Sequence, residues 1–387
     1  MLNDVSIKEG DIELKNGGQC VFLYGVNHNG ENENPTFIFY DKFRSNGIKV
    51  EITDKNFQVY LLHPYTILVD ISKHSDYIHK NSEYWFSLDS QNRRLYAGVG
   101  EPRLETMKYC YFFQNVTHKK LLEGLRIIQH NTRIECKKVL KDPITRHLPL
   151  LVKDTDMLTM DDIARGTYMP KSNLSLVSQK LYDCISGKKF VLDTPEFPDF
   201  SKAIEYSIRT TGCWCNTTLK NKATEFNKDK PNIKETYLRI TLGENNGESP
   251  GVPYVMEIWP VGHYSPVHSH AGADAIIRVL HGSIHVKLYP YLGDKSIKPF
   301  GAADFKEGDI TWISPVLNQT HQLENLVSNK DTCITIQCYM YNNKDRTHYD
   351  YFDYIDADDE IQEYEPDSDM DFIAFKECMK REWDLRT

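Results

Sequence analysis

The stretch that decides the fold is Gly262-His-Tyr-Ser-Pro-Val-His268-Ser-His270, which places two histidines two residues apart. Residues two apart on a β-strand point to the same face, so both imidazoles can reach one metal ion. A third histidine follows further along the chain, in His321-Gln-Leu-Glu-Asn325. The segment 276–289 between them is typical of a hairpin with Gly282 at its bend. Three neutral imidazoles would form a metal site that leaves positions open for a substrate.

The order and spacing of these motifs resemble one β-barrel fold. Gly-x5-His-x-His, then a glycine turn, then His-x3-Asn is the two-motif pattern of the cupin barrel. We therefore predict a mainly β chain whose C-terminal half is a cupin (a double-stranded β-helix, or jelly roll) with flanking helices. The spacing predicts metal ligation by His268, His270 and His321. Nitrogen ligands and open positions favour Fe(II), with Ni, Mn and Zn as alternatives.

Further elements around these histidines are similar to one enzyme family. They are Tyr237-Leu-Arg239, Ile258-Trp259, Gly262-His263, Ser265-Pro-Val-His268-Ser-His270, Val279-Leu-His-Gly282 and His321-x3-Asn325. Together they resemble the cysteine dioxygenase family of thiol dioxygenases over roughly residues 172–345. The resemblance implies an Fe(II) enzyme that adds O2 to the sulfur of cysteine, or of a related small thiol carboxylate such as 3-mercaptopropionate, to give the sulfinate.

The same resemblance implies roles for the residues at the matching positions. The family's iron ligands fall on His268, His270 and His321. Its carboxylate-binding arginine falls on Arg239, and a guanidinium fork suits a carboxylate. Its active-site tyrosine falls on Tyr339, which would hydrogen-bond dioxygen or substrate.

Four further residues complete the predicted pocket. Trp259 falls on the family's aromatic wall, although a core tryptophan explains this residue equally well. Tyr237 is expected to line the substrate pocket beside Arg239. Thr335 and Gln337 share one strand face with Tyr339, so both are expected to support its hydroxyl.

Three positions depart from the family pattern. Ala275 stands where mammalian members carry a cysteine that is crosslinked to the tyrosine, so this thioether cannot form. Gln337 replaces a histidine and cannot shuttle a proton. Asp274 lies four residues after His270, where many other cupins carry a glutamate ligand. Two alternatives therefore stay open: a weak or inactive metal-binding cupin in a structural or binding protein, and a cupin of other chemistry with Asp274 as fourth ligand.

The N-terminal part has a different pattern. Residues 1–117 contain short apolar runs separated by turn residues, which predicts a β-sandwich. The stretch 83–101 is similar to β-sandwich domains of the farnesoic acid O-methyltransferase type, which implies a module that binds a protein or glycan ligand. Residues 118–171 are predicted to be a helical connector, because 119–128 has helical spacing. Residues 172–387 are assigned to the cupin domain, with a helix expected over 176–185.

Composition narrows the function classes. The 387 residues exceed one typical domain, and 40% hydrophobic with 26% charged residues is a globular composition. Eleven acidic residues and no lysine or arginine lie in 350–371, which predicts a solvated acidic tail and contributes more than the whole net charge of −9. No nucleic-acid motif, membrane-spanning run or N-terminal secretion signal is evident. A cytoplasmic protein with reduced cysteines is expected.

Overall fold

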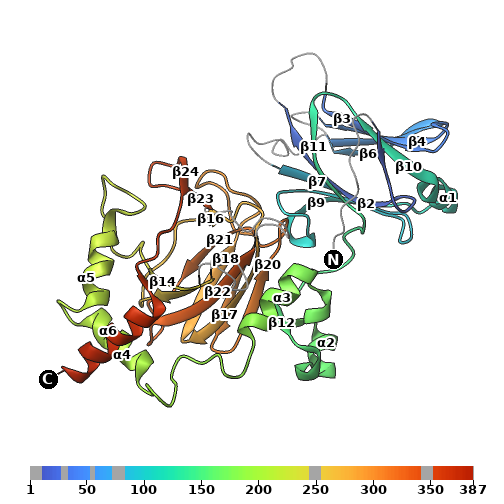
Figure 1. Cartoon of the computed structure of the whole chain (residues 1–387). Helices are drawn as coiled ribbons and strands as arrows, with labels where there is room; N and C mark the ends of the chain where they lie inside the picture. The colour runs from blue at the N-terminus through green and yellow to red at the C-terminus, as the bar shows by residue number, and fades with distance from the viewer. Residues whose placement is uncertain are drawn as a thin grey trace. The chain divides into compact units, whose positions relative to one another are not determined.

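The computed structural model describes residues 11–27, 34–52, 57–71, 83–243, 254–340 and 352–386, so the N-terminal residues in which no secretion signal was found lie outside these ranges. The chain divides into two compact units, Met1–His147 (unit 1) and Leu148–Thr387 (unit 2). Strands predominate in both units, which confirms the mainly β fold class (Figure 1). Among the described helices, none is long and apolar enough to cross a membrane. All nine cysteines are free.

Unit 1 is built from two antiparallel sheets. One sheet has the spatial order β1 (Ile12–Glu13), β10 (Leu125–His130), β3 (Thr36–Asp41), β4 (Gly47–Ile52), β5 (Phe57–Leu62) and β6 (Tyr65–Ile71). The other has the order β11 (Ile134–Leu140), β2 (Gln19–Val26), β7 (Glu83–Asp89), β8 (Arg94–Val99) and β9 (Met107–Phe112). The buried ring of Phe37 on β3 lies 5.1 Å from that of Phe22 on β2 and 5.3 Å from that of Phe86 on β7. Because these contacts join the two sheets, unit 1 is the predicted β-sandwich.

The predicted helical connector over 118–171 is wrong in most of its length. In the first part of this segment only α1 (Val116–Gly124) is helical. The next two elements are strands: β10 pairs with β3, and β11 pairs with β2. The structural boundary therefore lies at 147 and not at 117. A register shift between Leu125 and Ile127 marks a bulge in β10. Because of this bulge, Leu125 and Ile128 are both buried although they are three residues apart. A bulge of this kind reproduces helical spacing in a strand.

Unit 2 is also built from two sheets. The first has the order β13 (Tyr168–Pro170), β12 (Leu151–Lys153), β20 (Ile310–Ile313), β17 (Asp274–His281), β22 (Cys333–Met340), β15 (Tyr254–Trp259), β14 (Leu238–Gly243) and β25 (Met370–Asp371). The second has the order β19 (Gly301–Lys306), β18 (Ser283–Leu288), β21 (Thr320–Glu324), β16 (His268–Ser269), β23 (Phe352–Ile355) and β24 (Ile361–Tyr364). From β16 to β18 and again from β20 to β22, each strand lies in the sheet opposite its predecessor. This alternation is the double-stranded β-helix that defines the cupin barrel.

Helices cover the outer face of the first sheet. The helix expected over 176–185 is confirmed as α3 (Leu176–Ile185), which packs against β17 and β22. The other helices are α2 (Met160–Arg165), α4 (Phe200–Arg209), α5 (Trp214–Asn221) and α6 (Phe372–Asp384). Figure 1 shows α4, α5 and α6 gathered beside β14. Their buried side chains share one apolar core with β14 and β15, including Phe200, Met256 and Phe375.

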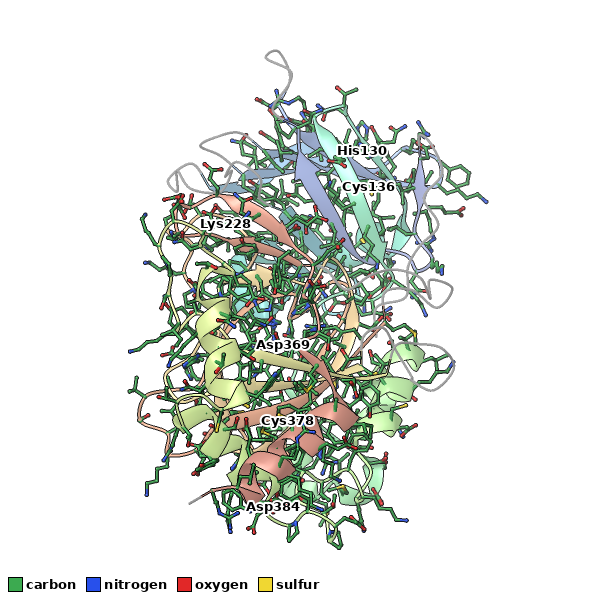
Figure 2. All side chains as sticks on the ribbon, turned by 60° about the vertical axis from the view of Figure 1, so that its left-hand side comes forward. His130, Cys136, Lys228, Asp369, Cys378 and Asp384 are labelled. Carbon is green, nitrogen blue, oxygen red and sulfur yellow. The ribbon has the colours of Figure 1, made fainter. Side chains whose placement is uncertain are left out.

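The predicted solvated acidic tail is confirmed for residues 357–363, which are exposed, but its described part, residues 352–371, also pairs with the barrel. β23 pairs with β16, β24 pairs with β23, and β25 pairs in parallel with β14. The aromatic residues between the acidic ones explain this, because Phe352 and Tyr354 are buried. Asp369, labelled in Figure 2, accepts hydrogen bonds from Lys222 Nζ and from the backbone N–H of Arg239. The tail is therefore part of the barrel.

Replacing Phe375 with alanine is expected to lower the free energy of unfolding of unit 2 by about 3–5 kcal/mol. Phe375 lies one helical turn before Cys378, which Figure 2 labels on α6. It has 0% exposure, and its ring lies 5.4 Å from Trp214 and 5.9 Å from Phe200. Ile373→Ala on the same helix is the control, since Ile373 is 65% exposed. Urea unfolding measures the free energy of unfolding of both variants. An equal loss in the two variants would contradict the packing of α6.

Candidate metal centre and its pocket

The three predicted ligands come together at the second sheet of the barrel. His268 on β16 lies directly opposite His321 on β21, and His270 follows β16 by one residue. One ring nitrogen from each of the three lies within 4.8 Å of the other two, and all three side chains are buried. Strand alternation thus brings His268 and His270 together, as the His-x-His spacing predicts. Cross-strand pairing then adds His321 as the third predicted ligand.

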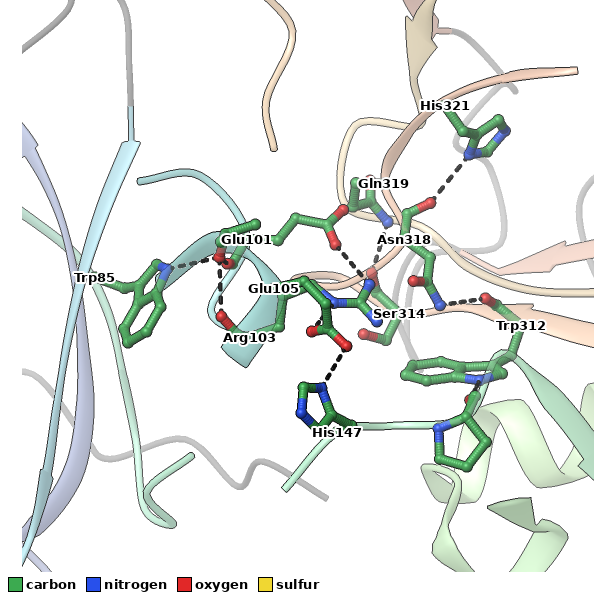
Figure 3. Close-up of polar contacts among 12 residues, drawn as sticks. Trp85, Glu101, Arg103, Glu105, His147, Trp312, Ser314, Asn318, Gln319 and His321 are labelled. Atoms are coloured by element: carbon green, nitrogen blue, oxygen red, sulfur yellow. Dashed lines mark hydrogen bonds and ion pairs between the residues drawn. The ribbon is translucent and has the colours of Figure 1, made fainter. Parts of the chain in front are cut away.

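The carbonyl groups around these histidines set their tautomers. His268 Nδ1 lies 3.0 Å from the carbonyl oxygen of Pro266, and His321 Nδ1 lies 3.0 Å from that of Asn318 (Figure 3). A carbonyl only accepts, so each Nδ1 donates and each Nε2 keeps a lone pair for a metal. The Asn318 amide is held in turn by the carbonyl oxygen of Trp312, at 2.9 Å.

The nitrogen positions fit a bound metal ion. Nε2 of His270 and Nε2 of His321 are 3.3 Å apart. Two nitrogens that bind one tetrahedral ion at about 2.0–2.1 Å are separated by roughly 3.3 Å. His270 Nδ1 is buried and has no hydrogen-bond partner among the residues that the structure describes. The donor set suits Fe(II), Zn(II), Ni(II) or Mn(II), with ligands that need no deprotonation.

Burial keeps the three imidazoles neutral. Loss of hydration, reinforced by the neighbouring His321, lowers the pKa of His268 to about 3. Burial also lowers the pKa of His321 to about 4. The pKa of His270 lies well below its usual value for the same reason, reinforced by His268 and His321. Neutral imidazole is the form that binds metal, so the site is ready to bind at neutral pH.

These pKa values predict how the metal-free protein responds to acid. Between about pH 4 and pH 6.5 the unfolded chain protonates these histidines while the folded protein does not, so stability falls as the pH is lowered through this window. Each histidine contributes a slope of about 1.4 kcal/mol per pH unit. Urea unfolding of the metal-free protein at a series of pH values measures this, and His268→Gln should give a shallower slope. An unchanged slope would contradict the burial argument.

The histidines open into a pocket within unit 2 whose empty space, counted together with the open solvent at its mouth, is about 790 Å³. Every predicted site residue lines it: Tyr237, Arg239, Trp259, His268, His270, His321, Thr335, Gln337 and Tyr339. Most of the remaining lining is apolar, including Ile277, Leu288 and Phe305. An apolar pocket with a few convergent polar groups is the usual form of a small-molecule site.

A chain of polar contacts runs along one wall of this pocket. The Tyr339 hydroxyl donates to Gln337 Oε1, and Gln337 Nε2 donates to Glu257 and, at 3.2 Å, to Thr335 Oγ1. Glu257 also accepts from Arg239 Nη1 at 3.3 Å. The shared strand face predicted for Thr335, Gln337 and Tyr339 is therefore observed, and Gln337 orients the tyrosine through its carbonyl oxygen.

Glu257 and Phe352 are among the pocket residues that the sequence did not predict. Glu257 lies two residues before Trp259 on β15, so strand alternation alone places it on the pocket face. Phe352 comes from the acidic segment, and its ring lies 4.7 Å from that of His268. No pattern signals Phe352, because its position depends on the pairing of β23 with β16.

Tyr237 and Trp259 lie side by side in the pocket lining. The rings of Tyr237 and Trp259 are stacked, with centroids 4.2 Å apart. Trp259 is 1% exposed and also belongs to the apolar core of the barrel, so both explanations of this residue hold.

The fourth-ligand alternative is contradicted. Asp274 Oδ1 accepts hydrogen bonds from Ser178 and Ser175 at the start of α3, at 2.7 and 3.1 Å, so this carboxylate points away from the histidines. The next residue on β17, Ala275, faces inward and lies directly opposite Tyr339. The strand pleat separates the two side chains. Position 275 is therefore beside the tyrosine, as the resemblance implies, and carries no sulfur.

Comparisons with known proteins give matches of low identity over less than a third of this chain. No protein-family model matches the chain. Solved structures that match include the cupin domain of Schizosaccharomyces pombe Cnp3 (13% identity, 27% of this chain and 65% of that one, TM-score 0.22). A cupin-like protein of Thermotoga maritima has 20% identity over 26% of this chain and 68% of that one, with TM-score 0.20. An oxalate oxidase has 21% identity over 29% and 54%, with TM-score 0.23.

The chain spans about half to two thirds of the lengths of these proteins. The strand order of unit 2 is that of the cupin fold. The barrel of unit 2 is thus a cupin with three histidines placed to hold a metal ion.

Proposed function

We propose that unit 2 is an Fe(II)-dependent thiol dioxygenase that converts cysteine, or a related small thiol carboxylate, to its sulfinate. The observation that carries the proposal is the position of Arg239 and Tyr339 in the same pocket as three buried, neutral histidines. The family resemblance of these residues supplies the reaction type. Three neutral ligands leave the full positive charge of a metal ion available to an anionic thiolate.

The bound metal would bind the thiolate and dioxygen and supply the redox chemistry. The residues of the chain position the substrate. Arg239 can donate to its carboxylate, while the stacked Tyr237 and Trp259 form an apolar wall that excludes water. Tyr339 lies beside His270, with ring centroids 5.2 Å apart, and directs its proton to Gln337 Oε1. Its oxygen therefore offers lone pairs to the pocket and accepts hydrogen bonds from bound groups.

Oxygen uptake tests the proposal directly. The full chain is loaded with Fe(II) under reducing conditions, and cysteine-dependent oxygen consumption is measured together with sulfinate formation. Oxygen consumption and sulfinate formation should be equal in molar amount. Arg239→Ala should raise the substrate concentration that is needed for half-maximal oxygen consumption. Iron-loaded protein that consumes no oxygen with cysteine or 3-mercaptopropionate would reject the proposal.

A metal-binding cupin without turnover is the second candidate. It is favoured by Gln337, which cannot move a proton, and by the contact of Arg239 with Glu257. This candidate predicts that iron binds with no thiol-dependent oxygen uptake, so the same experiment separates the two.

For unit 1 we propose a role in binding a protein or glycan ligand. The support is the sandwich fold together with the resemblance of residues 83–101. Screening the full chain against protein and glycan arrays tests this role. As the specificity control, an excess of the same ligand in free form should abolish the signal. A chain that binds nothing on either array would reject this role.

A further inference from the structure

The pocket of unit 2 has a polar part and an apolar part, which come from different strands. The histidines lie on or next to β16 and β21, and the wall of polar contacts comes from β14, β15 and β22. The neighbouring strands β17, β18 and β19 contribute apolar side chains to the same pocket. We call this group the apolar lobe; it consists of Ile277, Val279, Ile284, Val286, Leu288 and Phe305.

Strand alternation builds the lobe from the inner face of β18. Ile284, Val286 and Leu288 follow one another at intervals of two residues, and all three line the pocket. The residues between them, His285 and Lys287, contact carboxylates on β19 and β21. The pattern of β18 therefore separates an apolar inner face from a polar outer face.

The lobe begins beside a predicted metal ligand. Leu288 on β18 lies directly opposite His321 on β21, and Val286 lies opposite Leu323 in the same antiparallel register. Residues that are directly opposite in such a pair have neighbouring side chains. The apolar surface therefore runs along β18 from the histidines through Val286 to Ile284.

Two side chains of the lobe are not fully packed. Ile277 and Val286 face the barrel interior and line the pocket, but they are only partly buried, whereas Val279 and Ile284 are each 2% exposed. Side chains in a filled core contact neighbours on all sides. Partial exposure inside the barrel therefore marks space that a ligand can occupy.

Polar groups at the edge of the lobe are directed to the backbone. Thr311 Oγ1 donates to the carbonyl oxygen of Leu150 at 2.9 Å, and Trp312 Nε1 donates to that of Pro149 at 3.0 Å. Both side chains line the pocket. The lobe thus presents mainly hydrocarbon to a ligand. Burial of an apolar group there is favourable, while a polar group would lose its hydration without compensation.

We propose that the apolar lobe binds a hydrocarbon arm of the substrate, so that the pocket takes thiols with an apolar substituent in preference to thiols without one. The inference rests on the proposed thiol dioxygenase function and narrows its substrate class. The thiolate end of such a ligand would lie at the histidines, and its arm would extend over Val286 and Ile277.

Binding measurements on the Co(II)-loaded full chain, without oxygen, test this independently of turnover. Three thiol acids that differ in their arm are titrated: mercaptoacetate (no arm), 2-mercaptohexanoate (an alkyl arm) and 2-mercapto-4-methoxybutanoate (an ether arm of the same length). The thiolate-to-metal absorption band is followed, and metal retention is checked. Since one buried methylene tightens binding by about fourfold, 2-mercaptohexanoate should bind at least about 30-fold more tightly than mercaptoacetate. The ether should bind at least about tenfold more weakly than 2-mercaptohexanoate.

Substitutions of Val286 test whether the lobe causes this preference. Val286→Phe fills the lobe and should bring the affinity ratio of 2-mercaptohexanoate to mercaptoacetate close to one. Val286→Thr keeps the size of the side chain and adds a hydroxyl, so it should lower the ratio by at least about threefold even if the larger residue impairs folding. Val327→Phe is the matched control, because Val327 is 75% exposed and does not line the pocket.

The outcomes separate the inference from the proposed function. Equal affinity of the unaltered protein for mercaptoacetate and 2-mercaptohexanoate would overturn the inference alone, since thiol binding would be intact. An unchanged affinity ratio in both Val286 variants would also overturn it, because the preference would then arise outside the lobe. Failure of all three thiols to bind would overturn the proposed function together with the inference.

Discussion

Replacing His321 with alanine is expected to reduce the affinity for Fe(II) or Zn(II) by more than about 100-fold, since loss of a supporting residue alone costs 10–100-fold. The substitution leaves His268 and His270, which cannot by themselves complete a facial set of three nitrogens. Sulfinate formation should be lost with the metal. Metal content after dialysis and calorimetric titration with Zn(II) measure the effect.

His285→Ala is the matched control for this experiment. His285 lies on β18 in the same barrel, but its ring contacts Asp304 and it does not line the pocket. Its replacement should leave metal affinity within about twofold, as expected for a surface change. Loss of metal in both variants would indicate general unfolding, and retention of metal in His321→Ala would reject the proposed ligand set.

Replacing Arg239 with methionine is expected to destabilise unit 2 by about 3–5 kcal/mol, because Glu257 is then left buried without its charged partner. The double variant with Glu257→Met should recover most of this loss, since an apolar pair of similar volume carries no buried charge. Urea unfolding of the metal-free proteins gives both free energies. The same Arg239 variant should also weaken binding of any carboxylate-bearing thiol.

The comparison of single and double variants isolates the ion pair. If Arg239→Met and the double variant are equally unstable, packing of the long side chain, and not its charge, explains the loss. If Arg239→Met is as stable as the unaltered protein, the buried pair does not exist in solution.

Local periodicity made much of the site predictable. The two-residue spacing of His268 and His270, and of Thr335, Gln337 and Tyr339, fixes a common face once a strand is assumed. The same rule would have found Glu257 from its spacing to Trp259. These residues depend on one strand each, so the pattern of that strand was sufficient.

Local periodicity did not predict the strands whose formation depends on pairing with another strand. The bulge in β10 gives Leu125 and Ile128 a helical spacing, and the strand is recognisable only from its pairing with β3. The acidic composition of 350–371 favours a solvated segment, yet Phe352 and Tyr354 are drawn into the barrel because β16 offers an unpaired edge to β23. Neither outcome is encoded in the segment by itself.

The sequence by itself therefore indicated the principal side chains of the pocket: three histidines, one arginine and one tyrosine, at spacings that suit a cupin barrel. Only the tertiary structure decided which charged and polar groups surround these side chains. It placed Glu257 against Arg239, turned Asp274 outward to α3, and folded an acidic segment against His268. The physical reason is that side-chain period is a property of one strand, whereas burial, charge pairing and pKa are set by neighbours distant in sequence.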